Sequence, residues 1–120
     1  MKIDPQVEQR LTTERNIWLA TVRSDGRPHL VPVWFVWLDQ KIFICTESKS
    51  LKARNILGNP NIAAALEDGD KPIVLEGLAK PIEQAAPTLV AAFQSKYDWD
   101  ITTDVQYNQM IEIEVKRIRA

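Results

Sequence analysis

The pattern of hydrophobic and polar positions predicts a protein built mostly from short β-strands. The alternation is clearest near the C-terminus, where Ile111, Ile113 and Val115 are predicted to face inward and the charged residues between them outward. Short strands joined by tight turns favour a closed antiparallel barrel with helices at its ends. The six predicted strands lie at residues 17–23, 28–38, 41–46, 61–67, 73–82 and 110–118.

Three other segments have the pattern of helices. Asp4 followed by Pro5 is a typical helix start, because the carboxylate caps free N–H groups and proline has none to lose; this helix should end near residues 14–16. A second helix, at residues 51–57, should stop at Gly58-Asn59-Pro60. A third is predicted over residues 83–97, with Pro87 in its first turn.

Turn and glycine signals refine this prediction. Asp25-Gly26 marks a tight hairpin between the first two strands, and Asp39-Gln40 marks another between the second and the third. Gly77 lies inside the strand predicted at residues 73–82, which suggests a bulge or a close approach of a neighbouring backbone.

The strand predicted at residues 28–38 contains a proline that does not suit a central strand. Pro32 has no backbone N–H to donate, so it indicates a sheet edge, a bulge, or a place where something other than a strand lies alongside. The first two readings are purely structural. In the third, a flat aromatic cofactor lies against Pro32, Val33 and Trp34, and the sequence leaves these alternatives open.

Composition bounds the function. The 120 residues fit one domain, and the balance of 15 Lys and Arg against 16 Asp and Glu gives no field that would attract nucleic acid or an anionic membrane. The single cysteine excludes an intramolecular disulfide and suggests a reducing compartment. The charged N-terminal region resembles no signal peptide, and no apolar run approaches the roughly 18 residues of a membrane span. We therefore expect a soluble, cytoplasmic protein.

The only histidine, His29, stands beside no cysteine or carboxylate in the sequence. A Cys/His zinc site therefore cannot be assembled within one chain, and no metal site is predicted. A Ser-His-Asp triad would also have to use His29, but no serine lies in a nucleophile-elbow pattern.

A second informative stretch runs from Thr46 to Asn55. It combines serines at a helix start with Lys49, Lys52 and Arg54, which places hydroxyl groups, free N–H groups and cations around the positive end of a helix. Such an arrangement suits a phosphate group. A capped, solvated helix with ordinary surface lysines would give the same pattern.

Taken together, these stretches resemble the flavin-binding split-barrel proteins, a group that includes pyridoxamine 5'-phosphate oxidases, small FMN-binding proteins and deazaflavin-dependent reductases. The resemblance covers nearly the whole chain and implies a six-stranded antiparallel split β-barrel, mainly β within the α+β class. The segments that carry it most specifically are residues 19–23 (Leu-Ala-Thr-Val-Arg), 25–29 (Asp-Gly-Arg-Pro-His), 31–35 (Val-Pro-Val-Trp-Phe), 50–55 (Ser-Leu-Lys-Ala-Arg-Asn) and 59–60 (Asn-Pro).

The resemblance also implies which residues contact FMN. The ring would lie along residues 31–35, the ribityl-phosphate region near Cys45 and Thr46, and the phosphate at residues 50–52. Leu51 stands where the oxidases usually have an arginine, so Arg54 or Lys49 would supply the missing charge. The implied contacts are Val31, Pro32, Val33, Trp34, Phe35, Cys45, Thr46, Ser50, Leu51, Lys52, Arg54 and Trp99.

The family forms two-fold dimers with both sites at the interface, so we expect a homodimer. In small relatives an aromatic residue at the place of Trp99 reaches the partner's flavin, although a core tryptophan would be equally ordinary. Four tryptophans are more aromatic surface than one small barrel easily hides. The chain ends directly after its last predicted strand, without the arginine and histidine segment that binds pyridoxal phosphate in the oxidases, so vitamin B6 oxidation is not assigned.

We therefore expect an FMN-binding oxidoreductase in which the flavin performs the chemistry, because no side chain is a convincing general acid or base. The substrate and the electron acceptor are not indicated by the sequence. One alternative is a reductase that uses the deazaflavin F420, whose tail would need the same basic helix start. Another is a non-catalytic flavin carrier or a haem-handling protein, for which His29 would be the only histidine ligand.

Overall fold

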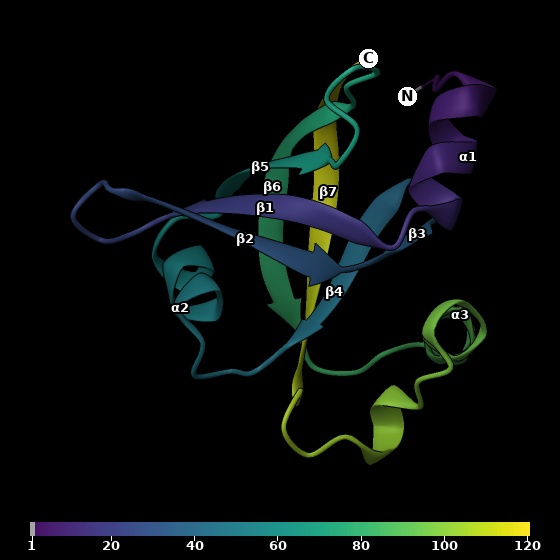
Figure 1. Ribbon diagram of the computed structural model, residues 1–120. Helices are drawn as coiled ribbons and strands as arrows, with labels where there is room; N and C mark the ends of the chain where they lie inside the picture. The colour runs from purple at the N-terminus through teal and green to yellow at the C-terminus, as the bar shows by residue number, and fades with distance from the viewer. Residues whose placement is uncertain (1) are drawn as a thin grey trace.

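A strongly curled antiparallel sheet forms the body of the protein in the computed structural model, which describes residues 2–120 (Figure 1). The described residues form seven strands in the order β2-β1-β5-β6-β7-β4-β3. The strands are β1 (Asn16–Val22), β2 (Pro28–Trp34), β3 (Val36–Leu38), β4 (Lys41–Thr46), β5 (Asn61–Leu66), β6 (Val74–Ile82) and β7 (Gln109–Arg119).

Three α-helices and one 3₁₀ helix accompany the sheet within residues 2–120: α1 (Pro5–Thr13), α2 (Leu51–Gly58), α3 (Pro87–Tyr97) and η1 (Ile101–Thr103). Asp4 caps α1 by accepting a hydrogen bond from the Gln6 N–H at 2.7 Å, as predicted. In Figure 1, α3 and η1 lie together at one end of the sheet, away from α1 and α2. None of the helices in the described part of the chain is long and apolar enough to cross a membrane.

The barrel is split because β2 and β3 are the two edges of the sheet. β3 pairs only with Lys41–Phe43 of β4, so residues 44–46 of β4 have no strand on that side. We call this open side, between β2 and the unpaired part of β4, the seam. The closed barrel favoured by the strand pattern is thus wrong, whereas the split barrel implied by the resemblance is confirmed.

The strand predicted at residues 28–38 is interrupted, which corrects the strand number from six to seven. Phe35 separates β2 from β3, and its side chain is fully buried. Its backbone N–H and C=O are bonded to side chains of α3 rather than to a neighbouring strand. Pro32 lies in the edge strand β2, opposite Trp18 of β1, which confirms the edge predicted from its missing N–H.

The third helix also begins later than predicted. Residues 83–86 are not helical, and α3 starts at Pro87, which occupies the first helical position. The cause is local: a residue that precedes proline is disfavoured in the helical conformation, and Ala86 is extended with ψ of 152°.

Two hydrophobic clusters hold these elements together. The larger lies inside the curl of the sheet, where Ile111, Ile113 and Val115 of β7 are buried as predicted. The smaller joins α3 to β3 and β4 through Val36, Phe43, Leu89, Phe93 and their neighbours. The second cluster fixes α3 and η1 beside the seam.

Gly77 marks a bulge in β6, where the register with β7 shifts between Glu76 and Gly77. A Cβ atom at Gly77 would overlap the backbone carbonyl of Glu114 on β7. The glycine is therefore required by the close approach of two backbones, as the sequence suggested.

We predict that Gly77→Ala lowers the free energy of unfolding by about 1–3 kcal/mol, because the added methyl forces β6 and β7 apart. Urea unfolding measures the change. Gly58→Ala is the matched control: the space around Gly58 is open, so its effect should stay within about 0.5 kcal/mol. Equal effects of the two variants would contradict the close approach at Gly77.

Candidate functional site

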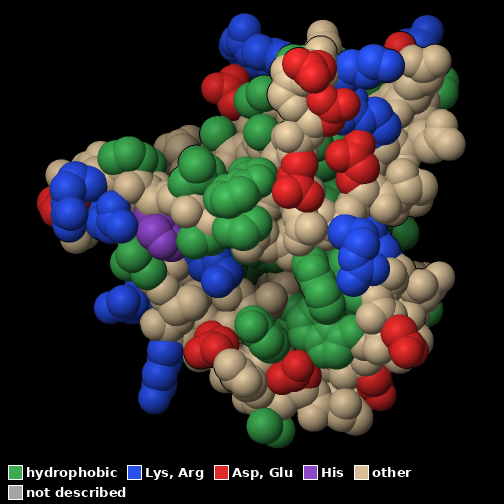
Figure 2. Space-filling model, viewed as in Figure 1, with side chains coloured by type: hydrophobic (Ala, Val, Ile, Leu, Met, Phe, Trp, Pro, Cys, Tyr) green, Lys and Arg blue, Asp and Glu red, His purple; other side chains and the backbone are tan. Residues whose placement is uncertain are grey.

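A cavity of about 560 Å³ opens at the seam, within the size range of ligand sites. Figure 2 shows a hollow in this face of the molecule, bordered by hydrophobic side chains and flanked by Lys and Arg side chains. The lining comes from β1, β2, β4, α2, the end of α3 and the segment around η1. Its residues are Asn16, Pro32, Val33, Trp34, Cys45, Lys52, Tyr97, Asp98, Trp99, Asp104 and Tyr107.

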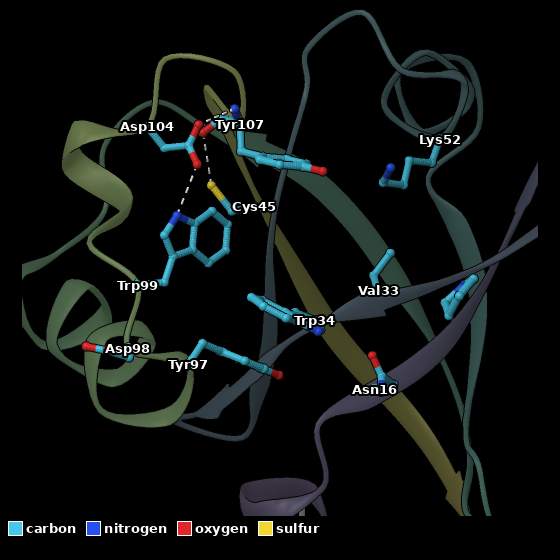
Figure 3. Close-up of a pocket in the computed structure, with 11 residues that line it drawn as sticks. Asn16, Val33, Trp34, Cys45, Lys52, Tyr97, Asp98, Trp99, Asp104 and Tyr107 are labelled. Atoms are coloured by element: carbon cyan, nitrogen blue, oxygen red, sulfur yellow. Dashed lines mark hydrogen bonds between the residues drawn. The ribbon is translucent and has the colours of Figure 1, made fainter.

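Aromatic rings form one end of the cavity. Trp34 stacks on Tyr97 with ring centroids 4.5 Å apart and planes 9° from parallel. Trp99 meets Trp34 edge-on at 6.0 Å and 71°, and meets Tyr107 at 5.8 Å and 83°. Trp99 therefore stands nearly perpendicular to both rings, with Tyr107 on one side of the space and Trp34 on the other (Figure 3). We call Trp34, Trp99 and Tyr107 the aromatic box, whose shape suits a flat ring.

Asp104 holds the wall of this box in place. Its carboxylate accepts a hydrogen bond from the Trp99 indole N–H at 3.0 Å and from the backbone N–H groups of Gln106 and Tyr107 (Figure 3). The bond from the Tyr107 N–H is the main cause that lowers the pKa of Asp104. The indole orientation is thus fixed by an ionised carboxylate.

Tyr97 ties the aromatic box to the strand break. Its hydroxyl accepts a hydrogen bond from the Phe35 N–H at 2.8 Å and lies within donating distance of two carbonyl oxygens, Arg15 at 2.7 Å and Phe35 at 2.8 Å. Lys96 donates a second bond to the Phe35 carbonyl at 2.9 Å. The last turn of α3 therefore satisfies the backbone groups that the interrupted strand leaves unpaired.

Burial shifts the pKa values of Tyr97 and Lys96 in the direction that favours their neutral forms. It raises the pKa of Tyr97, which keeps the hydroxyl protonated, and it lowers the pKa of Lys96 to about 8, with a further contribution from the nearby Arg15 guanidinium. The guanidinium carbon of Arg15 lies 5.1 Å from the Trp34 ring centroid and 5.0 Å from that of Tyr97, within the range of cation–π contacts.

Lys52 forms the opposite side of the cavity. It lies in the first turn of α2 and is half-buried; burial lowers the pKa of its amine, an effect that Glu47 partly opposes. Ser50 caps the helix by accepting a bond from the Ala53 N–H at 3.3 Å, and its hydroxyl lies 3.2 Å from that of Thr46. A partly desolvated cation at a helix N-terminus favours an anionic ligand group.

Cys45 contributes a neutral wall. Its thiol donates to the Tyr107 carbonyl at 3.3 Å, and burial, with a smaller contribution from Asp104, raises its pKa to about 11. A thiol of that pKa is a poor nucleophile at neutral pH.

Within residues 2–120, no group of three or more His, Cys, Asp or Glu side chains is placed to hold a metal ion.

Half of the cofactor contacts implied by the resemblance meet in this cavity. Phe35 is instead in the core, and Thr46 is fully buried behind the helix start. Arg54 is exposed and does not line the cavity, nor do Val31, Ser50 and Leu51. The six that line it are Pro32, Val33, Trp34, Cys45, Lys52 and Trp99.

Sequence reasoning missed five residues that line the cavity: Asn16, Tyr97, Asp98, Asp104 and Tyr107. Tyr97 carried a signal, because it stands two residues before Trp99 at the end of a predicted helix. Asp104 and Tyr107 carried none, because their place depends on how the loop after η1 folds back over β4.

An aromatic cavity in the seam of a curled antiparallel sheet places this protein among the small split-barrel proteins. The sequence matches the pyridoxamine 5'-phosphate oxidase family over residues 3–120, and the chain therefore belongs to that family.

Three solved structures are similar to this chain. An F420 reductase is similar at 23% identity over 98% of each chain, with a TM-score of 0.79. HutZ, the haem storage protein of Vibrio cholerae, is 18% identical over 100% of this chain and 95% of its own, with a TM-score of 0.82. General Stress Protein 26 of Bacillus anthracis is 28% identical over 94% and 88% of the two chains, with a TM-score of 0.75. The first two structures are less than 25% identical to this chain, so their likeness shows the fold alone. A search of curated proteins finds no match.

We predict that Tyr97→Phe lowers the free energy of unfolding by about 1–3 kcal/mol, because the buried Phe35 N–H loses its acceptor while the stack on Trp34 remains. Thermal or urea unfolding measures the change. Tyr107→Phe removes the same atom from a 40% exposed ring whose hydroxyl has no hydrogen bond within the described residues, and it should be nearly neutral. If the two variants were equally stable, the Tyr97 hydroxyl would not be the group that holds the strand break.

Proposed function

We propose that this protein is a homodimeric oxidoreductase that binds FMN in the seam cavity. The observation that carries the proposal is the distribution of groups in the cavity: an aromatic box at one end and the half-buried cation Lys52 at the other. A flavin needs both, a flat apolar site for its ring and a cation for its phosphate.

The residues present fit such a cofactor. The rings of Trp34, Trp99 and Tyr107 would bind and orient the isoalloxazine and exclude water, and Lys52 with the α2 N-terminus would bind the phosphate. When bound, the flavin supplies hydride or electron transfer. Cys45 keeps its proton and His29 does not line the cavity, so we assign neither as a general acid or base.

The deazaflavin F420 is the second candidate, supported by the likeness to a solved F420 reductase over 98% of the chain. Its ring and phosphate would make the same demands on the cavity. A haem site has less support, because His29 is the only histidine of the chain and does not line the cavity.

The phosphate assignment predicts that Lys52→Ala weakens FMN binding by about one to two orders of magnitude, the range expected for one lost charge-assisted contact. Riboflavin, which lacks the phosphate, should bind wild type and variant alike. Fluorescence titration measures both dissociation constants.

Lys49→Ala is the matched control, because Lys49 carries the same charge near the same helix start but is exposed and does not line the cavity. It should leave FMN affinity within about twofold of wild type. Equal loss in the two variants, or equal loss of FMN and riboflavin in Lys52→Ala, would contradict the placement of the phosphate.

The proposed dimer rests on an exposed apolar face of the sheet. Cross-strand pairs place Trp18 beside Pro32 and Ala65, and Ala20 beside Leu30, on one face. Trp18 is 37% exposed and Leu30 60% exposed. A face of this kind is typical of an interface between subunits. Because Pro32 also lines the cavity, a second copy on this face would border the ligand site.

We predict a dimer in solution at micromolar concentration and its dissociation by Trp18→Glu, because a carboxylate would be buried in an apolar interface. Light scattering distinguishes the dimer from the 13.7 kDa chain. Leu57→Glu is the control: Leu57 is 67% exposed but lies on α2, outside this face, and its variant should stay dimeric. A monomeric wild type would overturn the dimer, and a dimeric Trp18→Glu variant would overturn its interface.

A further inference from the structure

The buried polar side chains of the described residues gather around one helix. Besides Tyr97 they are Thr21, Thr46 and Asn55, and each belongs to α2 or contacts α2 or its cap. A polar group in an apolar core lowers stability unless it is hydrogen-bonded. Their concentration here indicates that hydrogen bonds, in addition to apolar packing, determine how α2 lies on the sheet.

Asn55 and Thr21 form a hydrogen-bonded pair in this core. The Asn55 amide Nδ2 donates to the Thr21 hydroxyl oxygen at 3.0 Å, which joins α2 to β1. Thr21 follows Ile17 and Leu19 on the buried side of β1. Valine has nearly the same branched shape as threonine and would fill this place with apolar surface alone. The feature that threonine adds is its hydroxyl, which accepts the bond from α2.

Asn55 lies one turn after Lys52 on α2. Residues three apart are neighbours on a helix surface, so a rotation of α2 that moves Asn55 also moves Lys52. In Figure 3, Lys52 extends from α2 toward the cavity that it lines. The other buried residues of α2, Ala53 and Ile56, make apolar contacts, which have no direction and tolerate more than one rotation of the helix. The Asn55 hydrogen bond is directional and selects one rotation.

A role in stability alone does not account for this pair. Asparagine is a poor helix former. Replacing both partners of a buried hydrogen bond by apolar groups of the same shape can be nearly neutral or even stabilising. A buried polar group is instead a known means of fixing one packing arrangement at a cost in stability.

We propose that Thr21 and Asn55 are positioning residues for the phosphate site: their hydrogen bond fixes the rotation of α2 about its axis and so directs Lys52 into the seam cavity. This inference rests on the proposed function and adds the residues that give the site its preference for a phosphorylated flavin. Neither side chain lines the cavity, so both act through Lys52.

The test is the double variant Thr21→Val/Asn55→Leu, which replaces both partners by apolar side chains of similar size. It should bind FMN about tenfold more weakly than wild type, bind riboflavin within about twofold, and keep its stability in urea. In a Lys52→Ala background the same two changes should cause no further loss of FMN affinity, because their effect passes through Lys52. Fluorescence titration measures the dissociation constants.

Two control variants separate positioning from stability. Thr21→Ser keeps the hydroxyl but loses a buried methyl, so it should lower stability and leave the ratio of FMN to riboflavin affinity unchanged. Asn59→Ala removes an asparagine at the other end of α2, where its side-chain oxygen accepts from the Asn61 N–H at 3.1 Å, and it should also leave that ratio unchanged. Equal loss of FMN and riboflavin in the double variant, or a changed ratio in Thr21→Ser, would overturn the positioning role.

If wild type binds no flavin, the proposed function fails, and the Lys52 amine still tests this inference without a ligand. Burial lowers the pKa of Lys52, against the opposite effect of Glu47. In the double variant the amine can turn toward solvent, so its pKa should rise toward that of an ordinary lysine. NMR titration of the Lys52 side chain, assigned by comparison with Lys52→Ala, measures the pKa. An unchanged Lys52 pKa in the double variant would overturn the inference whether or not flavin binds.

Discussion

The hydrogen bonds that α3 makes to the backbone of Phe35 are the constraint on which the rest of the site depends. An interrupted strand leaves a buried N–H and C=O unpaired, and each such group costs about 1–3 kcal/mol unless a partner is supplied. Tyr97 and Lys96 supply those partners from the last turn of α3. Because the same Tyr97 ring stacks on Trp34, one residue closes the strand break and positions the first wall of the cavity.

This constraint links the parts of the chain that form the site. With α3 fixed against β3 and β4, the segment that follows it places Trp99 across the end of the cavity, and Asp104 holds that indole in place. The seam stays open because β3 is too short to cover all of β4. Lys52, on α2, faces the aromatic box from the other side of the opening (Figure 3). A site with an apolar end and a cationic end is thus a consequence of how the barrel is split.

The sequence predicted most of the fold because its strongest signals are local. Asp4-Pro5, Asp25-Gly26 and the alternation in β7 depend on a few neighbouring residues, and each was confirmed. The break at Phe35 could not be predicted, because the residue that satisfies its backbone is 62 positions away. The late start of α3 has a local cause, because the proline at its first position disfavours a helical conformation at Ala86.

The residues of the candidate site fall into the same two groups, those with a local sequence signal and those placed only by the fold. Pro32, Trp34 and Lys52 were found because an unusual residue in a strand and a basic helix start are visible in the sequence. Asp104 and Tyr107 were not found, because only the folded loop brings them to the cavity. Phe35 was expected beside the ring. Its side chain is instead fully buried in the core, at the break between β2 and β3.

The central claim, that the seam cavity is a flavin site, is tested most directly by the visible absorption spectrum of the purified protein after incubation with FMN and desalting. We predict that the flavin band, near about 450 nm, elutes with the protein. We also predict that the tryptophan emission is quenched in proportion to the FMN retained, because Trp34 and Trp99 border the cavity. Complete separation of FMN from the protein, with tryptophan emission unchanged at saturating FMN, would contradict the account.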